Sequence, residues 1–371
     1  MKKILSLILA TLAVCATFLF TACGSSNNTL KNPEGKYDQS LAGTTLNVYN
    51  WGEYISDGSE DTLDVNAAFE KLTGIKVNYI TYDSNEVMYS KLKGGAETFD
   101  IIIPSDYMIQ RLISEDMLMK FNVSELSNYH YIDDQYKGLY YDPDNAYSVP
   151  YNVGMVGLLY NKSMVQETVD SWSIMWDSKY SGQILTFNNS RDAFGIAQFL
   201  LGQDVNSTDR ADWDAAERKL KEQNTVLQGR VMDEVFVKME NGNAAIAPYY
   251  AGDCLSMMEN NKDLELVFPK EGVNIFVDAV CIPKNAQNVE AAKLYINFLL
   301  EPEVALANAE TLCYASPNTA VVNNEEYSLY GNKYLYPSEA DMPKTQYFHD
   351  LPEDVRSYYE DLWTEVIRDK G

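Results

Sequence analysis

The stretch from residue 45 to residue 112 alternates between strand-like and helical spacing of apolar side chains. Residues 45–50 and 75–80 alternate polar and apolar positions, as half-buried strands do. Residues 62–72 carry apolar side chains at helical spacing up to Gly74, a typical helix terminator. Residues 100–104 are apolar almost throughout and predict a buried strand. This order of strands and helices predicts an α/β sheet with helices on its faces.

The same alternation continues to residue 300. In the first part, one more helix should be capped by Ser84 or Asn85, and another should run through Leu112. Further strands are expected at residues 154–160, 183–187, 244–250 and 275–282. Further helices are expected at residues 171–177, 211–223, 233–241 and 289–300, with another that starts within 188–192. No repeat or heptad interrupts the pattern, so we expect two α/β lobes in one chain.

The N-terminus looks like a bacterial lipoprotein signal. Lys2 and Lys3 precede an apolar run over residues 4–20, and small residues then surround Cys23. Cleavage before Cys23 would leave this cysteine as the lipidated first residue. A plain membrane-spanning anchor is the alternative, for which the apolar run is marginal in length.

This signal predicts the compartment and the first segments of the chain. Residues 1–22 are expected to be a signal peptide, and residues 23–44 a lipidated flexible tether that begins with a Gly/Ser-rich stretch. Nothing later in the sequence reaches membrane-spanning length. We therefore expect an extracytoplasmic globule, held by its lipid to the outer face of the cell membrane.

Charge and composition narrow the range of partners. Acidic residues outnumber basic residues 54 to 29, and the resulting net charge of −25 argues against nucleic acid as a partner. Two histidines in the whole chain make a His-rich metal site implausible, and no metal or cofactor is expected. The 27 tyrosines, on an acidic surface, could select cations, although solubility and ordinary core packing explain the same composition.

Cysteine use does not indicate a disulfide framework. Cys15 leaves with the signal and Cys23 would carry lipid, so Cys254, Cys281 and Cys313 remain. Three is an odd number, and no CxxC spacing occurs. Each of the three lies in an apolar or small-residue run, so we expect buried free thiols.

Candidate binding residues gather at the ends of the expected strands. Ligands of open α/β sheets bind beyond the carboxyl ends of strands. The residues there are Trp51, Glu53, Tyr54, Ser105, Asp106, Tyr107, Asn189, Asp192, Tyr249, Tyr250, Phe276 and Asp278. A sugar site usually adds Arg or Lys to such aromatics, and an anion site needs bases or a Gly-rich helix start. Aromatic faces with carboxylates suit an organic cation that carries an alkyl body.

Several motifs resemble one family over nearly the whole mature length. The motifs are residues 49–54, 73–77, 81–86, 149–151, 268–272, 296–300 and 314–318. They are similar to the spermidine/putrescine-binding proteins of ABC importers. The resemblance implies a two-lobed periplasmic-binding-protein-like (type II) fold with hinge strands between the lobes. It also implies a monomer that closes over a polyamine, delivers it to a membrane permease and performs no catalysis.

The resemblance implies the lobes and the site as well. Lobe 1 should contain residues 45–151 and 277–313, and lobe 2 residues 152–276 and 314–371. The implied ligand-binding residues are Trp51, Glu53, Tyr54, Ser105, Tyr107, Asn189, Asp192, Tyr250, Phe276, Asp278 and Tyr314. Asn189 departs from the family, which often has Asp there. Tyr250 and Phe276 stand where the family commonly has Trp.

Each of these residues also has a purely structural interpretation. Trp51 and Phe276 could be core aromatics, and Asp192 could only cap a helix. Asp278 favours ligand contact, because it lies inside the apolar strand 276–280, where an unpaired carboxylate is costly to bury.

Two other functions remain open at this stage. One is a sugar-binding importer protein of the same architecture. The other is an extracytoplasmic glycoside hydrolase that uses two carboxylates as acid and base. For other hydrolases, the sequence offers no G-x-S-x-G nucleophile elbow and no Cys/His pairing.

Overall fold

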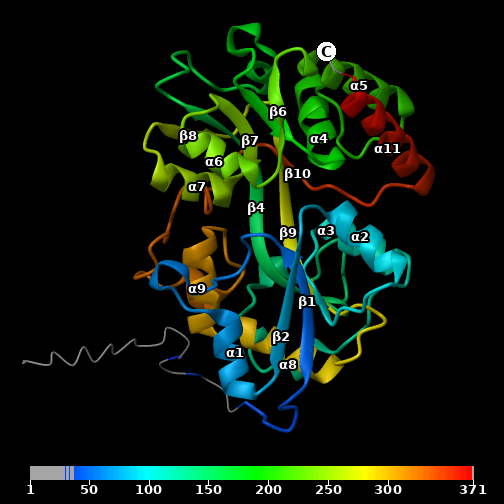
Figure 1. Cartoon of the computed structure of the whole chain (residues 1–371), viewed down its shortest axis with the longest axis vertical. Helices are drawn as coiled ribbons and strands as arrows, with labels where there is room; N and C mark the ends of the chain where they lie inside the picture. The colour runs from blue at the N-terminus through cyan, green and yellow to red at the C-terminus, as the bar shows by residue number, and fades with distance from the viewer. Residues whose placement is uncertain (1–29, 31–32, 34–36, 370–371) are drawn as a thin grey trace, which may run out of the picture.

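The computed structural model, which describes residues 30, 33 and 37–369, consists of two α/β lobes stacked one above the other (Figure 1). We call the lower lobe of Figure 1 lobe 1 and the upper lobe lobe 2. Cys23 and the expected signal peptide 1–22 lie outside the described residues, as does most of the expected tether 23–44. Among the helices of the described part, none combines the length and the apolar character needed to cross a membrane.

Lobe 1 is built around a parallel sheet in the order β2-β1-β3. Its elements are β1 (Thr45–Trp51), α1 (Val65–Thr73), β2 (Lys76–Tyr82), α2 (Asn85–Gly94), β3 (Ile101–Ile102), α3 (Asp106–Ser114), α8 (Val289–Leu299), α9 (Pro302–Leu312) and α10 (Thr319–Val322). The predicted helix signals are confirmed. The α1 helix ends at Gly74, with φ of 72°, and the Ser84 hydroxyl caps α2 by accepting a hydrogen bond from the amide of Val87.

Lobe 2 continues the sheet through β7, β5 and β6. Its elements are β5 (Ile184–Phe187), α4 (Ser190–Leu201), α5 (Arg210–Asn224), β6 (Leu227–Val231), α6 (Glu234–Glu240), β7 (Ile246–Tyr250), α7 (Ala251–Asn260), β8 (Leu264–Val267), β10 (Thr345–Gln346) and α11 (Glu353–Arg368). The helix expected over residues 171–177 is instead a short 3-10 helix, Trp172–Trp176.

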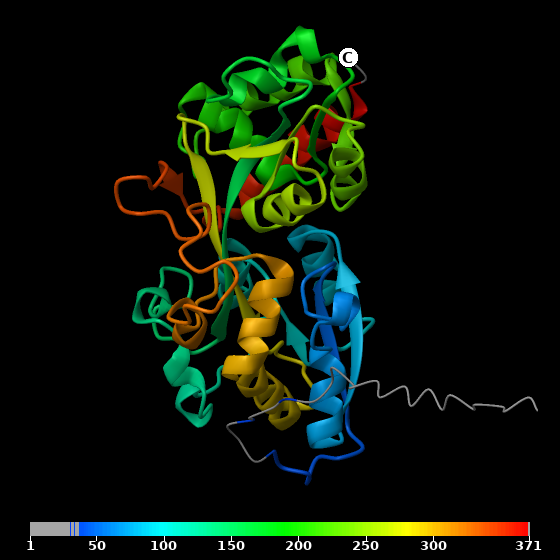
Figure 2. The same ribbon diagram turned by 90° about the vertical axis from the view of Figure 1, so that its left-hand side faces the viewer.

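Two long antiparallel strands, β4 (Ser148–Asn161) and β9 (Val273–Cys281), connect the lobes, as Figure 2 shows from the side. At one end β9 pairs with β3 of lobe 1, and at the other β4 pairs with β7 of lobe 2. The predicted two-lobed α/β fold with strands between the lobes is therefore confirmed. The β4 strand begins six residues earlier than expected, and it includes Pro150 because the ladder with β9 slips there, between Pro150 and Asn152.

The three cysteines of the described chain are free and buried, as predicted. Burial raises the pKa of the Cys254, Cys281 and Cys313 thiols, so the reactive thiolate is disfavoured in each. All three therefore serve as small apolar side chains in the core.

Candidate ligand-binding site

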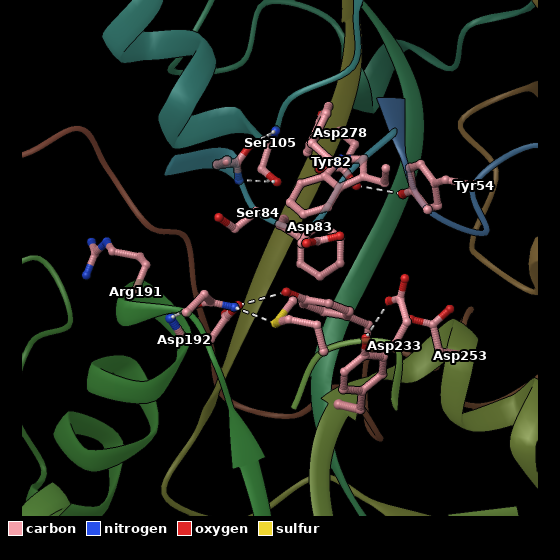
Figure 3. Close-up of a pocket in the computed structure, with 18 of the residues that line it drawn as sticks. Tyr54, Tyr82, Asp83, Ser84, Ser105, Arg191, Asp192, Asp233, Asp253 and Asp278 are labelled. Atoms are coloured by element: carbon pink, nitrogen blue, oxygen red, sulfur yellow. Dashed lines mark hydrogen bonds between the residues drawn. The ribbon is translucent and has the colours of Figure 1, made fainter. Parts of the chain in front are cut away.

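A pocket with about 790 Å³ of empty space, part of it open to solvent, lies between the lobes (Figure 3). Lobe 1 lines it from the end of β1 and the first turns of α2 and α3, and lobe 2 from the ends of β5 and β7 and the helices that follow them. The structure brings all eleven predicted ligand-binding residues together in this pocket. They are Trp51, Glu53, Tyr54, Ser105, Tyr107, Asn189, Asp192, Tyr250, Phe276, Asp278 and Tyr314.

Asp278 occupies the inner wall, on the connecting strand β9, and is only 3% exposed. Tyr54, from the loop after β1, donates a hydrogen bond of 2.6 Å from its hydroxyl to Oδ2 of Asp278. The other oxygen, Oδ1, is buried without a hydrogen bond of ordinary geometry, although Ser105 lies close enough for its hydroxyl to lower the pKa of Asp278. Burial raises the pKa of Asp278 to about 6, and the nearby charge of Asp192 adds to the shift. A cation in the pocket would give this carboxylate the partner that it lacks.

Asp192 faces the pocket from the first turn of α4. The Tyr250 hydroxyl donates to its Oδ2 at 2.8 Å, and the Asn189 side-chain amide donates to the same oxygen at 2.9 Å. The N-cap of α4 is Asn189, whose Oδ1 accepts from the amide of Asp192. Asp192 is thus not the helix cap, and its carboxylate remains turned toward the pocket. Burial raises the pKa of Asp192 to about 6, with Glu86 adding to the shift.

Asp253, in the first turn of α7, is a pocket residue that the sequence analysis missed. The Tyr314 hydroxyl donates to its Oδ2 at 2.9 Å. Gly252 makes this approach possible, because a Cβ there would lie 2.3 Å from Cδ2 of the Tyr314 ring. Burial, together with the charges of Asp233 and Glu53, raises the pKa of Asp253 to about 8.

Two more acids of the pocket are held in the same way. Tyr107 donates from its hydroxyl to Glu86 at 2.8 Å, and Tyr249 donates to Asp233 at 3.2 Å. Five carboxylates of the pocket therefore each accept a hydrogen bond from a tyrosine hydroxyl, which gives part of the tyrosine excess a use. A sequence signal exists for Glu86, since it lies in the first turn of the helix predicted after Ser84. Asp253 has no such signal, because α7 begins without a side-chain cap.

Aromatic rings form the remaining walls. Trp51 is fixed by a 2.8 Å hydrogen bond from its indole nitrogen to the carbonyl of Ile103. Phe276 packs edge-on against Tyr250, with ring centroids 5.4 Å apart, and Tyr314 packs edge-on against Tyr54 at 5.2 Å. These rings present apolar faces between the acids. Both suspected core aromatics, Trp51 and Phe276, line the pocket.

Ser105 and Glu53 complete the set of predicted residues. Ser105 precedes α3, and its hydroxyl accepts from the side-chain amide of Asn85 at 3.1 Å. Glu53 is exposed at the pocket mouth, where its φ of 46° turns the chain through the left-handed region. Its neighbour Gly52 lies close to lobe 2, since a Cβ there would be 2.7 Å from Oδ2 of Asp233.

The charge of the pocket is strongly one-sided. Seven carboxylates line it, from Glu53, Asp83, Glu86, Asp192, Asp233, Asp253 and Asp278. The single base of the lining is the buried Arg191, whose guanidinium is turned away from the pocket (Figure 3). It donates to the carbonyl of Val205 and to Oδ1 of Asn206, each at 2.9 Å. No group of three His, Cys, Asp or Glu side chains in the described residues is arranged to hold a metal ion. The pocket is suited to an organic cation with an apolar body.

Comparisons with known proteins agree with this chemistry. The family model described as bacterial extracellular solute-binding protein matches residues 65–333. The chain is 33% identical to the spermidine/putrescine-binding periplasmic protein of Salmonella typhimurium over 324 residues, which cover 87% of this chain and 91% of the relative.

Solved structures of similar proteins share the fold. The spermidine/putrescine ABC transporter substrate-binding protein of Streptococcus pneumoniae is 33% identical with a TM-score of 0.71, covering 88% of this chain and all of that one. A lipoprotein of Treponema pallidum is 25% identical with a TM-score of 0.74, covering 87% of this chain and 99% of that one.

Proposed function

Because the chain belongs to the family of bacterial extracellular solute-binding proteins, we propose that it captures a polyamine between its lobes and delivers it to an ABC permease. The observation that carries this proposal is the set of five tyrosine-held carboxylates in one aromatic pocket. The relative from Salmonella typhimurium is named for spermidine and putrescine, which are ligands of this chemical kind.

The proposed binding mode follows from the cost of burying charge. An ammonium group leaves water at little cost only if carboxylates and further acceptors replace its hydration. Asp278, Asp192 and Asp253 supply the charges, and Trp51 and Phe276 cover the methylene chain between the ammonium ends. The eleven residues predicted from sequence, with Asp253 added, are our proposed ligand site. The protein returns its ligand chemically unchanged.

Lobe closure over the ligand is part of the proposal. The strands β4 and β9 act as hinges, since they are the strands of the described chain that run through both lobes. Their positions support the expected boundaries near residues 151 and 277, where the chain passes from one lobe to the other. The last crossing is better placed between α10 and β10 than at residue 314, because Val321 of α10 packs against Ala309 of α9 in lobe 1. We propose that the protein works as a monomer.

A panel of ligands compared by thermal shift tests the function. Putrescine, spermidine, cadaverine and agmatine should raise the unfolding midpoint by several degrees, because a ligand at a hundred times its Kd stabilises the folded state by about 2.7 kcal/mol. Maltose and glutamate, as a neutral and an acidic control, should leave the midpoint unchanged. A midpoint raised by maltose alone would favour the sugar-binding alternative, and no response to any amine would refute the proposal.

We also propose that Cys23 carries a lipid that holds the protein on the outer face of the cell membrane. The signal-like sequence before Cys23 supports this, as does the name of the Treponema pallidum relative, a lipoprotein. Cys23→Ser in the full-length chain should move the protein from the membrane fraction to the soluble fraction of expressing cells. A variant that stays with the membrane as the unchanged protein does would instead support an uncleaved spanning anchor.

A further inference from the structure

A cluster of charged side chains joins the lobes beside the ligand pocket and is not needed to contact the ligand. The α11 helix belongs to lobe 2, where Leu351, Val355 and Tyr359 pack with residues of α4 and α5 in one apolar cluster. The segment that leads from β10 into α11 nevertheless runs along α3 of lobe 1 (Figure 1). Contacts between this segment and α3 must break or stretch if the lobes separate there.

Arg356 is the centre of these contacts. Its Nη1 lies 2.5 Å from Oδ1 of Asp350 within lobe 2, and its Nη2 lies 3.5 Å from Oε1 of Glu115 at the end of α3. The Arg356 and Asp350 side chains are 15% and 14% exposed, so water screens this cluster much less than a surface ion pair.

Hydrogen bonds from lobe 1 reinforce the same junction. The backbone amide of Asp350 donates to Oε1 of Gln110 at 2.8 Å. Tyr140 donates from its hydroxyl to the carbonyl of Phe348 at 2.5 Å, and its ring lies 4.3 Å from that of His349. The hydroxyl of Ser114 also donates to Oδ2 of Asp350, at 3.4 Å. Four side chains of lobe 1 thus contact residues 348–356 of lobe 2: Gln110, Ser114, Glu115 and Tyr140.

Glu115 is prepared for this role by its own lobe. Burial alone would raise its pKa, but hydrogen bonds from Tyr89, Arg111 and Lys93 hold the pKa of Glu115 at about 2. The carboxylate is therefore charged at any physiological pH and already oriented by lobe 1. Arg356 can join or leave it without a change of protonation.

The junction is also tied mechanically to the pocket. The N-terminus of α3 carries Ser105 and Tyr107, and Phe348 lines the pocket from the other lobe. Movement of α3 relative to the segment around Phe348 would shift ligand-contacting walls against each other. A clamp at this position can therefore act on the bound ligand without touching it.

We infer that the Arg356–Glu115 contact, with the Gln110–Asp350 hydrogen bond, is an interlobe clamp that holds the lobes closed and slows ligand release. Arg356 is thus a positioning residue for capture. This inference rests on the proposed function only for the identity of the ligand, since the clamp itself joins the lobes whatever the pocket contains.

Arg356→Gln tests the clamp through ligand dissociation, followed by tryptophan fluorescence in stopped flow with putrescine and spermidine. We expect the dissociation rate to rise at least tenfold while the association rate changes less than threefold. Arg356→Lys should give an intermediate rate. Lysine keeps the positive charge but lacks the two guanidinium nitrogens with which Arg356 contacts Asp350 and Glu115 at once. Gln110→Ala, which removes only the neighbouring hydrogen bond, should raise the dissociation rate in the same direction. Unchanged dissociation in both Arg356→Gln and Gln110→Ala would overturn the inference.

The control is Lys293→Gln, because Lys293 is similarly buried, at 20% exposed, and pairs with Glu125 and Glu290 within lobe 1 alone. It should leave dissociation unchanged. Small-angle scattering of the ligand-free proteins separates the clamp from the proposed function: Arg356→Gln should give a larger radius of gyration than the unchanged protein. An equal radius would count against the clamp even if the unchanged protein bound no polyamine at all. A variant that loses thermal stability but keeps both radius and dissociation rate would show a purely structural role.

Discussion

Asp278→Asn should weaken polyamine binding by at least tenfold without loss of the fold. The substitution keeps the size of the side chain and its hydrogen bond from Tyr54, and it removes the charge that an ammonium group needs. Truncating one partner of a buried charge pair costs about 2–5 kcal/mol in binding, which corresponds to roughly thirtyfold to several thousandfold in Kd. Isothermal titration with putrescine and spermidine measures the loss directly.

The ligand-free protein should not lose stability through this change. No basic side chain pairs with Asp278 in the described chain, and burial with the nearby charge of Asp192 outweighs its hydrogen bonds, since the pKa is raised to about 6. The unfolding midpoint of Asp278→Asn without ligand should match or exceed that of the unchanged protein. Equal affinities in variant and unchanged protein would remove Asp278 from the site.

Asp142→Asn is the matched control, a buried aspartate outside the pocket. Its carboxylate accepts from the backbone amides of Ala146, Tyr147 and Ser148 and from the Ser148 hydroxyl. Replacing one acceptor oxygen by an NH2 group should lower the unfolding midpoint by several degrees. Affinity in the folded fraction should stay unchanged. The two variants should therefore show opposite patterns. Asp278→Asn should lose affinity and keep its stability, whereas Asp142→Asn should lose stability and keep its affinity.

Most of the candidate binding residues could be predicted from the sequence, because the topology of an α/β sheet brings the ends of its strands together. Trp51, Ser105, Asn189 and Tyr250 lie at or just after the carboxyl ends of β1, β3, β5 and β7, and within each lobe these strands are parallel, so their ends meet at one edge. Asp278 reaches the same pocket from inside the antiparallel strand β9, which crosses between the lobes. The family indicated by the motifs is confirmed as well. What the sequence did not reveal is the partner of each acid. Tyr54 and Asp278, for example, are 224 positions apart in the chain.

The missed residue Asp253 shows how an error in one element carries into the site. The pattern predicts a strand at residues 244–250 but no helix after it, because α7 starts at Ala251–Gly252 without a side-chain cap. An acid three residues beyond Tyr250 therefore had no expected place. Asp192, by contrast, was found because Asn189 marks the start of its helix.

Some elements of the fold are absent from the sequence-based prediction, among them β6 and α11. The β6 strand contains Gly229 and Arg230 and lacks clear alternation, so only its pairing with β5 defines it. The α11 helix had a readable start at Pro352, but its attachment to lobe 2 depends on contacts with α4 and α5 far away in sequence. Long-range packing of this kind is not encoded in local periodicity.

Polyamine affinity should rise steeply with pH between about 6 and 8. In the ligand-free pocket, burial and neighbouring acids raise the pKa of Asp253 to about 8, so this carboxyl is mostly protonated at pH 7. An ammonium group of the ligand pairs with the charged carboxylate of Asp253, so Asp253 must lose its proton before it can bind the ligand. Well below the pKa, each pH unit therefore costs about tenfold in affinity for that one proton. Because the carboxyl is already half protonated at pH 8, the loss from pH 8 to pH 6 is about fiftyfold.

The opposite slope is expected for the stability of the ligand-free protein. The pKa of Asp253 is raised on folding, so the folded state binds more protons than the unfolded state at pH values between about 4 and 8. Stability without ligand should therefore fall as the pH rises toward 8. Saturating polyamine should flatten this fall, because the ligand compensates the charge that appears on Asp253.

Titration calorimetry at pH 7, in two buffers of different ionisation enthalpy, measures the protons released on binding. We expect about one proton in the unchanged protein, mainly from Asp253, because Asp278 and Asp192, with pKa near 6, are already largely charged. Asp253→Asn should bind more weakly at pH 8, release almost no proton and lose the slope between pH 7 and 8. It should keep a slope near pH 6, where Asp278 and Asp192 titrate. A flat affinity from pH 6 to 8 with no proton release would mean that the ammonium groups bind elsewhere than at these buried acids.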